Sequence, residues 1–175
     1  MSKGGVYFHY RAKEHIFQDI LDNLARSLEQ RWSFDSMSEQ PADRTLASLV
    51  VAHLRTMEDE PDEVRLHNLL VTMAVKDVVL REKLEEVTRI MRGLYTGVIE
   101  RGIREGLFVA DDPDTLAISV LAYINGLGAY AVLDRQSRLP VAPRSAAEQV
   151  LRMVRRQASA SSVEFGVPSS SSKPN

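Results

Sequence analysis

The apolar residues of this chain recur at helical spacing over most of its length. From residue 16 to residue 28 they return every three or four positions, which places them on one face of a helix that fades around Ser33. This stripe consists of Ile16, Phe17, Ile20, Leu21, Leu24 and Leu28. The same period predicts further helices over residues 42–57, 64–80, 81–105, 115–133 and 145–157. No stretch favours a strand, so we expect an all-α protein.

Local signals indicate where several of these helices begin and end. Pro61 is suited to the first turn of the helix that follows it, and Gly106 to the C-cap of the helix that precedes it. The run "DDPD", with Pro113 as its third residue, is a start signal for the next helix. Ser145 and Glu148 have the spacing of a capping box, which predicts that the last helix begins there.

Two of the expected helices are apolar on more than one side. Residues 64–80 are apolar on most sides, so we expect this helix to lie deep in the domain. Residues 115–133 carry no charge and are long enough to span a bilayer. They also contain Asn125 and two glycines, and no basic cluster flanks them. We therefore favour the buried helix of a soluble bundle or dimer, with no membrane partner.

Composition narrows the class of protein. A chain of 175 residues suits one compact domain, and the lack of cysteine excludes disulfides, thiolate catalysis and cysteine-based zinc sites. Together with the lack of a signal peptide, this predicts a cytoplasmic protein. The net charge of −2 argues against a generally basic surface for nucleic acid. Residues 1–15 nevertheless carry a local charge of +2, so an anionic partner would bind at this end.

No arrangement of residues indicates catalysis, a metal site or a cofactor. None of the histidines has the spacing of a helical zinc motif, and the chain has no phosphate-binding loop and no GxSxG motif. The aspartates of "DDPD" lack the spacing and the terminal glutamate of a calcium loop. We therefore expect a protein that is not an enzyme and that needs no cofactor.

The first residues, "SKGGVYFHYRAKEHIF", carry the most distinctive chemistry of the chain. A helix that reads DNA contacts base edges through its first turns, while flanking polar groups bind phosphates. Glycines would let the backbone approach the groove, and the lysines, Tyr7 and His9 could bind phosphates or bases. The candidate DNA contacts are Ser2, Lys3, Gly4, Gly5, Tyr7, His9 and Lys13. The residues alone leave an alternative open, an ordinary helix start whose aromatic side chains pack in a core.

This opening stretch resembles the second half of the DNA-binding motif of the TetR family of transcriptional regulators. The match runs through Ser2, Lys3, Gly4, Val6, Tyr7, His9, Tyr10, Lys13 and Glu14. The stretch "ERGIREGLFVADDPDTLAISVLAYINGL" is similar to the part of the family that leads into its penultimate helix. The resemblance covers roughly residues 2–157.

The resemblance implies a TetR-like helical bundle that dimerises through residues 115–133 and 145–157. It implies that residues 1–13 are the remnant of a helix-turn-helix domain, because the family has helices ahead of this point. Residues 14–157 would form the effector-binding and dimerisation domain, and residues 158–175 a disordered tail rich in Ser and Pro. The complete protein would bind operator DNA, most often as a repressor that a small apolar or amphipathic effector releases.

The effector pocket should lie among the helices between residues 42 and 133. Its candidate lining residues are His53, Met57, Met73, Met91, Tyr95, Tyr123 and Asn125, where apolar stripes carry an occasional polar group. The alternative is that the Met and Tyr residues simply fill the core. Three functions remain open: a ligand-responsive regulator, a dimeric small-molecule-binding module without DNA binding and, with weaker support, a helical enzyme or lipid carrier.

Overall fold

The computed structural model describes residues 19–21 and 40–155. Residues 19–21 are helical, and the longer range contains α3 (Ala42–Asp59), α4 (Pro61–Ala74), α5 (Val78–Arg104), α6 (Pro113–Leu133) and α7 (Pro143–Val154). Within these ranges the only β-type pairing is an isolated bridge between Phe108 and Arg155. The all-α prediction is confirmed for this part of the chain. The tail 158–175 and the boundary between residues 13 and 14 lie outside it.

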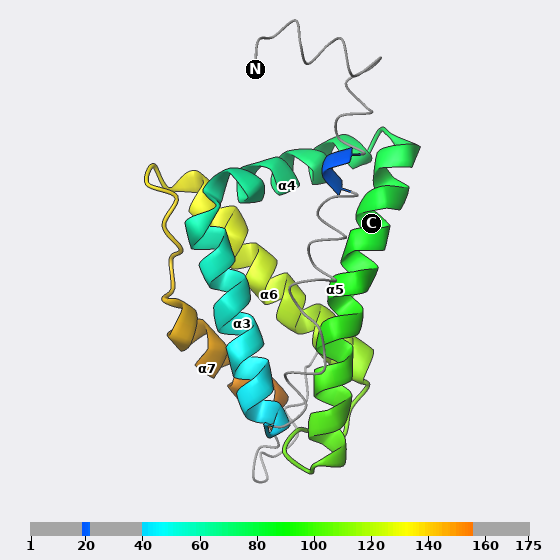
Figure 1. The fold of residues 1–175 in the computed structure, drawn as a ribbon, viewed down its shortest axis with the longest axis vertical. Coiled ribbons are helices and arrows are strands. Elements are labelled where there is room, and N and C mark those ends of the chain that lie inside the picture. The colour runs from blue at the N-terminus through cyan, green and yellow to red at the C-terminus, as the bar shows by residue number, and fades with distance from the viewer. Residues whose placement is uncertain (1–18, 22–39, 156–175) are drawn as a thin grey trace, which may run out of the picture.

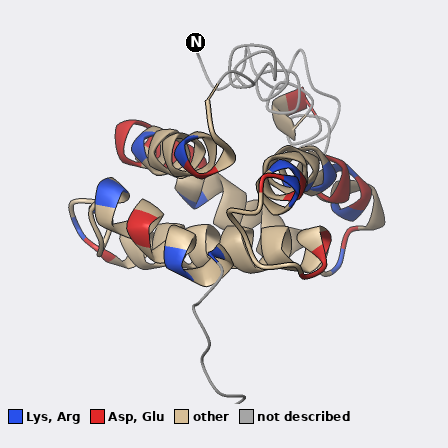
Figure 2. Cartoon of the chain, turned by 90° about the horizontal axis from the view of Figure 1, so that it is seen from below, with Lys and Arg blue, Asp and Glu red and all other residues tan. Residues whose placement is uncertain are grey.

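The helices form two layers. Figure 1 shows α4 lying across the adjacent ends of α3 and α5, while α6 crosses behind them. The view in Figure 2 shows α6 and α7 together in the second layer. α3 packs mainly against α7, and α5 packs against both α6 and α4.

Apolar side chains form two separate clusters. The main core joins α3, α5, α6 and α7, and residues such as Leu46, Leu54 and Ile124 are completely buried in it. A smaller group, which we call the corner cluster, lies where α4 meets α5. It consists of Leu21, Leu70, Ala74, Leu80, Leu84 and Val87, with Leu66 and Met73 packed against it. Leu21 is only 1% exposed, so the segment 19–21 is held at this corner.

The predicted helix over residues 64–80 is in fact divided. α4 ends at Ala74, and the Asp77 side chain accepts a hydrogen bond of 3.0 Å from the Leu80 backbone N–H, which caps the start of α5. The prediction of a deeply buried helix is also wrong, because several apolar side chains here are half exposed or more. They are Leu69, Val71, Val75, Val78 and Val79. Because apolar residues continue through this stretch, its sequence pattern indicated neither the break between α4 and α5 nor the exposed face.

The local start and stop signals were mostly correct. Pro61 and Pro113 occupy the first turns of α4 and α6, and Gly106 follows the end of α5 with a φ of +73°. The predicted capping box at Ser145 is wrong, because α7 already begins at Pro143 and has no side-chain cap. Pro143, pre-set for the first turn, determines that start.

α6 is half buried rather than fully buried. It is long and apolar enough to pass a length test for a membrane span, and 39% of its most apolar stretch is buried inside the protein. One face carries fully buried residues such as Val120 and Ile124. The opposite face exposes Ile118, Tyr130 and Leu133, by 48%, 66% and 80%.

Candidate functional site

A polar pair lies inside the main core. His53 of α3 and Tyr95 of α5 share a hydrogen bond of 3.1 Å between Nδ1 and the phenolic oxygen. Burial raises the pKa of the Tyr95 hydroxyl and lowers the pKa of His53 to about 4, with a smaller contribution from the charge of His67. Both side chains of the pair are therefore neutral at pH 7, and each satisfies the other in an apolar setting.

His67 of α4 is a further partly buried polar residue, and it was not among the predicted effector residues. It is half buried, and burial lowers its pKa. Its charge is the smaller of the two causes that lower the pKa of His53. The two histidines stand on different helices, so helical periodicity could not have paired them.

The predicted effector residues divide between several places. Tyr95 and Met91 belong to the main core, against which Met57 and Tyr123 pack. Met57 also lies close to α6, because a Cβ added to Gly128 would be 3.2 Å from its sulfur. Met73 packs instead against the corner cluster. Asn125 is exposed on α6 and does not line the interior, because α6 buries the neighbouring face that carries Ile124.

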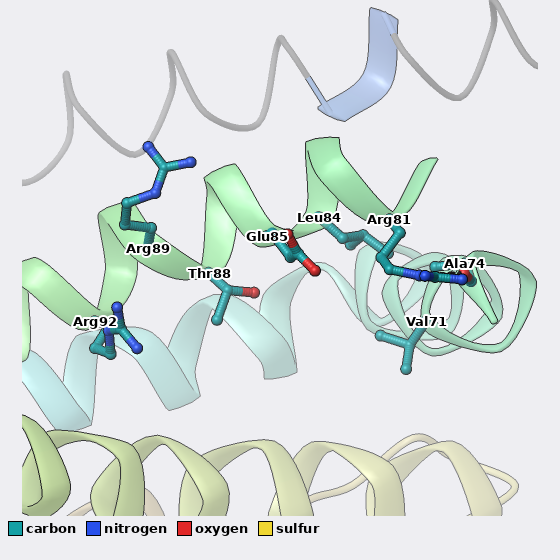
Figure 3. Close-up of a pocket in the computed structure, with 8 residues that line it drawn as sticks. All are labelled: Val71, Ala74, Arg81, Leu84, Glu85, Thr88, Arg89 and Arg92. Atoms are coloured by element: carbon teal, nitrogen blue, oxygen red, sulfur yellow. Dashed lines mark hydrogen bonds between the residues drawn. The ribbon is translucent and has the colours of Figure 1, made fainter. Parts of the chain in front are cut away.

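A cavity of about 460 Å³ lies between α4 and α5. Its lining residues are Val71, Ala74, Arg81, Leu84, Glu85, Thr88, Arg89 and Arg92. Figure 3 shows Glu85, Thr88 and Arg92 on one side of α5, whereas Arg89 extends toward the other. None of the eight was among the predicted effector residues, because charges repeated along one helix face look like an ordinary solvated surface.

Two of these arginines are held in place by specific contacts. Arg81 donates from Nε to the Ala74 carbonyl oxygen at 3.2 Å and from Nη2 to that of Val75 at 3.1 Å. These are carbonyls at the end of α4, which favour a positive charge. Arg92 is paired through Nε with Asp114, at 3.3 Å, and Asp114 also accepts a hydrogen bond of 3.2 Å from Thr96. Both guanidinium groups are thus positioned before any ligand binds.

The cavity adjoins the corner cluster. Ala74 and Leu84 line the cavity and also belong to the cluster that buries Leu21. Figure 3 shows the short helical segment 19–21 beside α5 at this place. A molecule in the cavity would therefore touch two of the side chains that pack around Leu21.

The two helices expected at a dimer interface differ. Asp114, near its start, is the only charged residue of α6, whose outer face is apolar or small. The apolar stripe of α7, which includes Ala146 and Val150, is buried in the main core that α7 shares with α3. Its outer side carries Glu148 and Arg152. Of the two, α6 has the larger unpaired apolar face.

The candidate DNA contacts from Ser2 to Lys13 lie outside the described residues. Within the ranges that are described, no group of three or more His, Cys, Asp or Glu side chains could hold a metal ion.

Comparison with known proteins identifies related sequences and structures. Residues 42–159 match the family described as "BetI-type transcriptional repressor, C-terminal". A TetR transcription regulator from Haloarcula marismortui has a similar structure, with a TM-score of 0.71 and 23% sequence identity over 88% of this chain and 86% of that one. No curated protein matches the sequence.

Two further structures share the fold. The MbdR regulator from Azoarcus sp. CIB aligns with a TM-score of 0.69 and 19% identity, covering 85% of this chain and 80% of that one. A regulatory protein of the tetR family from Rhodococcus RHA1 aligns with a TM-score of 0.62 and 25% identity, covering 88% and 80%.

Proposed function

The chain belongs to the TetR family of transcriptional regulators, and from this premise we propose that it is a ligand-responsive repressor. It would bind operator DNA as a homodimer and release it when a small apolar or amphipathic effector binds. The protein is a regulator rather than an enzyme. As a soluble protein that acts on DNA, it would work in the cytoplasm.

The observation that carries this proposal is the shared lining of the cavity and the corner cluster. Ala74 and Leu84 contribute to both, and Leu21 is buried among the cluster residues. Residues 1–13, which resemble a DNA-reading motif, end eight positions before Leu21. An effector that displaces Ala74 or Leu84 would therefore move the anchor of the segment that is proposed to bind DNA. Such a switch requires only that the effector binds more tightly when Leu21 and its neighbours are in one position than when they are in the other.

The exposed face of α6 supports a homodimer. Its outer side carries Ile118, Tyr130 and Leu133, whereas charged residues are the norm on surfaces that stay in water. Gly126 and Ala129 on the same side are small enough to let a second helix approach closely. We expect α6 to supply the apolar centre of the interface and α7 its polar rim.

The experiment is a fluorescence anisotropy titration with DNA from upstream of the gene. The chain is compared with a version extended by any upstream in-frame codons, at several salt concentrations, and the assembly state is measured by light scattering. Tight binding of either form that weakens steeply with salt and exceeds binding to random DNA supports a regulator. A dimer that binds none of the tiled upstream fragments in either form would instead favour a small-molecule-binding module without DNA binding.

A further inference from the structure

We infer that the interior beside the α4–α5 cavity binds an uncharged apolar molecule through its carbonyl oxygen, which accepts a hydrogen bond from Nε2–H of His53. Tyr95 acts as a positioning residue that orients this imidazole. The inference names the chemical class of the proposed effector and rests on the proposed function only for its effect on DNA. Binding itself is a property of the purified protein and can be measured without DNA.

The hydrogen bond between His53 and Tyr95 determines which imidazole nitrogen carries the proton. Tyr95 is completely buried, and among the described residues His53 Nδ1 is the only group bonded to its hydroxyl. A buried hydroxyl that donates to nothing is costly, so the Tyr95 hydroxyl donates and Nδ1 accepts. Because the imidazole is neutral at pH 7, its single proton is on Nε2, which is therefore a hydrogen-bond donor.

This donor lies at a place where the packing of the bundle is incomplete. Within the described ranges, the bond at Nδ1 is the only hydrogen bond of His53. Leu49 and Val50 precede His53 by four and three residues on the same face of α3, and both are completely buried. His53 is nevertheless partly exposed. A side chain on such an inward face stays exposed only where its neighbours leave space beside it.

The cavity between α4 and α5 lies beside this part of the interior. Its lining residue Arg92 stands three residues before Tyr95 on α5, and its lining residue Val71 stands four residues after His67 on α4. Residues at these separations share one face of a helix, so the cavity and the polar residues border the same side of both helices. A ligand bonded to His53 would extend its body toward this cavity.

The charges at the cavity favour an uncharged ligand. Arg92 is paired with Asp114 at 3.3 Å, and Glu85 in the same lining balances Arg81. Arg89 extends toward the other side of α5 (Figure 3). The pair of His53 and Tyr95 is neutral as well. An ionic ligand would therefore lose its hydration without gaining an unpaired charge of opposite sign.

The walls suit an apolar body. Val71, Ala74 and Leu84 supply the apolar part of the cavity lining, and the volume of about 460 Å³ lies within the range of small-molecule sites. Ala74 and Leu84 also belong to the corner cluster. The end of the ligand away from its carbonyl would thus lie beside the residues that bury Leu21.

The test compares three ligands that share a naphthalene skeleton. 2-Acetylnaphthalene carries a carbonyl, 2-isopropylnaphthalene has nearly the same shape without an acceptor, and 2-naphthoate is an anion. Their Kd values are measured by equilibrium dialysis against the full chain and the variants His53→Leu, His53→Gln and His67→Leu. His67→Leu is the matched control, because it removes a partly buried imidazole that is not bonded to Tyr95.

His53→Leu should raise the Kd of the ketone about tenfold, because a buried acceptor loses its donor. The Kd of the hydrocarbon should change less than about twofold, which also shows that the variant is folded. His53→Gln places an amide N–H near the position of Nε2 and should keep most of the ketone affinity. His67→Leu should leave the ratio of the two Kd values unchanged, and naphthoate should bind at least about tenfold more weakly than the ketone.

A spectroscopic measurement separates the hydrogen bond from a change in packing. The carbonyl stretching frequency of the bound, isotope-labelled ketone should be lower in the unsubstituted protein than in His53→Leu. Tyr95→Phe keeps the donor but removes the bond that orients it, so it should raise the Kd of the ketone about threefold. Tyr123→Phe should have no such effect.

Four results would overturn the inference: no binding of the ketone, equal changes for ketone and hydrocarbon in His53→Leu, no difference in carbonyl frequency, or naphthoate binding as tight as that of the ketone. A loss of ketone affinity in His67→Leu rather than in His53→Leu would also contradict it. If the ketone binds as expected but does not weaken DNA binding, the carbonyl site stands and the proposed regulatory function fails. If the protein binds its operator but not the ketone, the proposed function stands and this inference fails.

Discussion

The main core and the α4–α5 corner differ in how completely their side chains are buried. In the main core, α3 buries Leu46, Leu49 and Leu54 completely, and the one polar pair described inside it is hydrogen-bonded. At the corner, Leu69 and Val71 are each 50% exposed, and a cavity lies between α4 and α5 beside the corner cluster. The main core is tightly packed and its polar pair is hydrogen-bonded, whereas the corner leaves apolar and charged side chains accessible to a ligand.

Polar contacts reinforce this difference at the end of the bundle far from α4. Arg101 of α5 donates to the Thr45 hydroxyl of α3 at 2.6 Å. Glu105 accepts from the Ala42 backbone N–H at 2.8 Å and lies 3.5 Å from Arg101. Figure 1 shows that these ends of α3 and α5 lie opposite α4. The body is therefore fastened at one end, while the other end can adjust to a ligand, as expected of regions with few buried contacts.

The largest expected difference between the two regions is the loss of unfolding free energy when a leucine is replaced by alanine. Leu46→Ala in the main core should lower the free energy of unfolding by about 4 kcal/mol, because the side chain is fully buried. Leu69→Ala at the corner removes the same atoms from a half-exposed position and should cost less than about 0.5 kcal/mol. Urea unfolding of both variants measures the difference. Equal losses would mean that the corner is as tightly packed as the core.

A glycine pair on α5 tests how closed the main core is. A Cβ on Gly102 would overlap the buried ring of Phe108, so Gly102→Ala should cost about 3 kcal/mol. Gly93, on the same helix, has open space around its Cβ position, and Gly93→Ala should stabilise the protein by up to about 1 kcal/mol. Thermal unfolding of the two variants provides the comparison. A neutral Gly102→Ala would show that Phe108 can move away freely.

The imidazole of His53, which is bonded to the buried Tyr95, should make the free energy of unfolding depend on pH. His53 has a pKa of about 4 in the folded protein against an ordinary value of 6.5, so the unfolded chain binds the proton more readily. Its contribution is complete above pH 6.5 and is lost as the pH falls toward 4, by about 2 kcal/mol between pH 6.5 and about pH 4.5. His53→Gln should remove most of this slope in urea unfolding at a series of pH values.

His67→Gln is the control for that titration. Burial also lowers the pKa of His67, so His67→Gln should remove the part of the slope that His67 itself contributes and the smaller of the two causes at His53, and should leave the part that is due to burial of His53. If both variants kept the full slope of the unsubstituted protein, the origin of the pH dependence would lie elsewhere.

The smallest expected effect concerns the hydrogen bond of the polar pair. Tyr95→Phe keeps the ring and removes the hydroxyl that contacts His53 Nδ1, so it should cost about 1 kcal/mol. Tyr123→Phe, at a half-buried tyrosine of α6 that packs against the same core, should cost less. Chemical unfolding at pH 7 compares them. A larger loss in Tyr123→Phe would show that the pair contributes little.

Much of the fold could be predicted because helices depend on local signals. A period of three to four residues identified the helical segments, and Pro61, Pro113 and Gly106 marked their ends correctly. The core residues Met91 and Tyr95 could be placed for the same reason, since each lies on an apolar stripe of its own helix. The prediction that the last helix begins at Ser145 was wrong because Pro143, two residues earlier, already starts α7.

The candidate site was harder to predict because it is formed between helices. The arginines of α5 have no special spacing, and only the carbonyls of α4 and the carboxylate of Asp114 give Arg81 and Arg92 fixed positions. Asn125 and the valines around residue 75 were placed on the wrong side for a related reason. Periodicity tells which residues share a face, but not whether another helix covers that face.

The sequence by itself therefore determined the helical class, most helix ends and the resemblance to a family of regulators. Only the tertiary structure decided that α4 and α5 separate at Asp77, that Leu21 is buried at their junction, and that a charged cavity opens beside it. The physical reason is that a helix is stabilised by contacts within a few residues of each other. A site such as this one depends on which faces of distant helices meet.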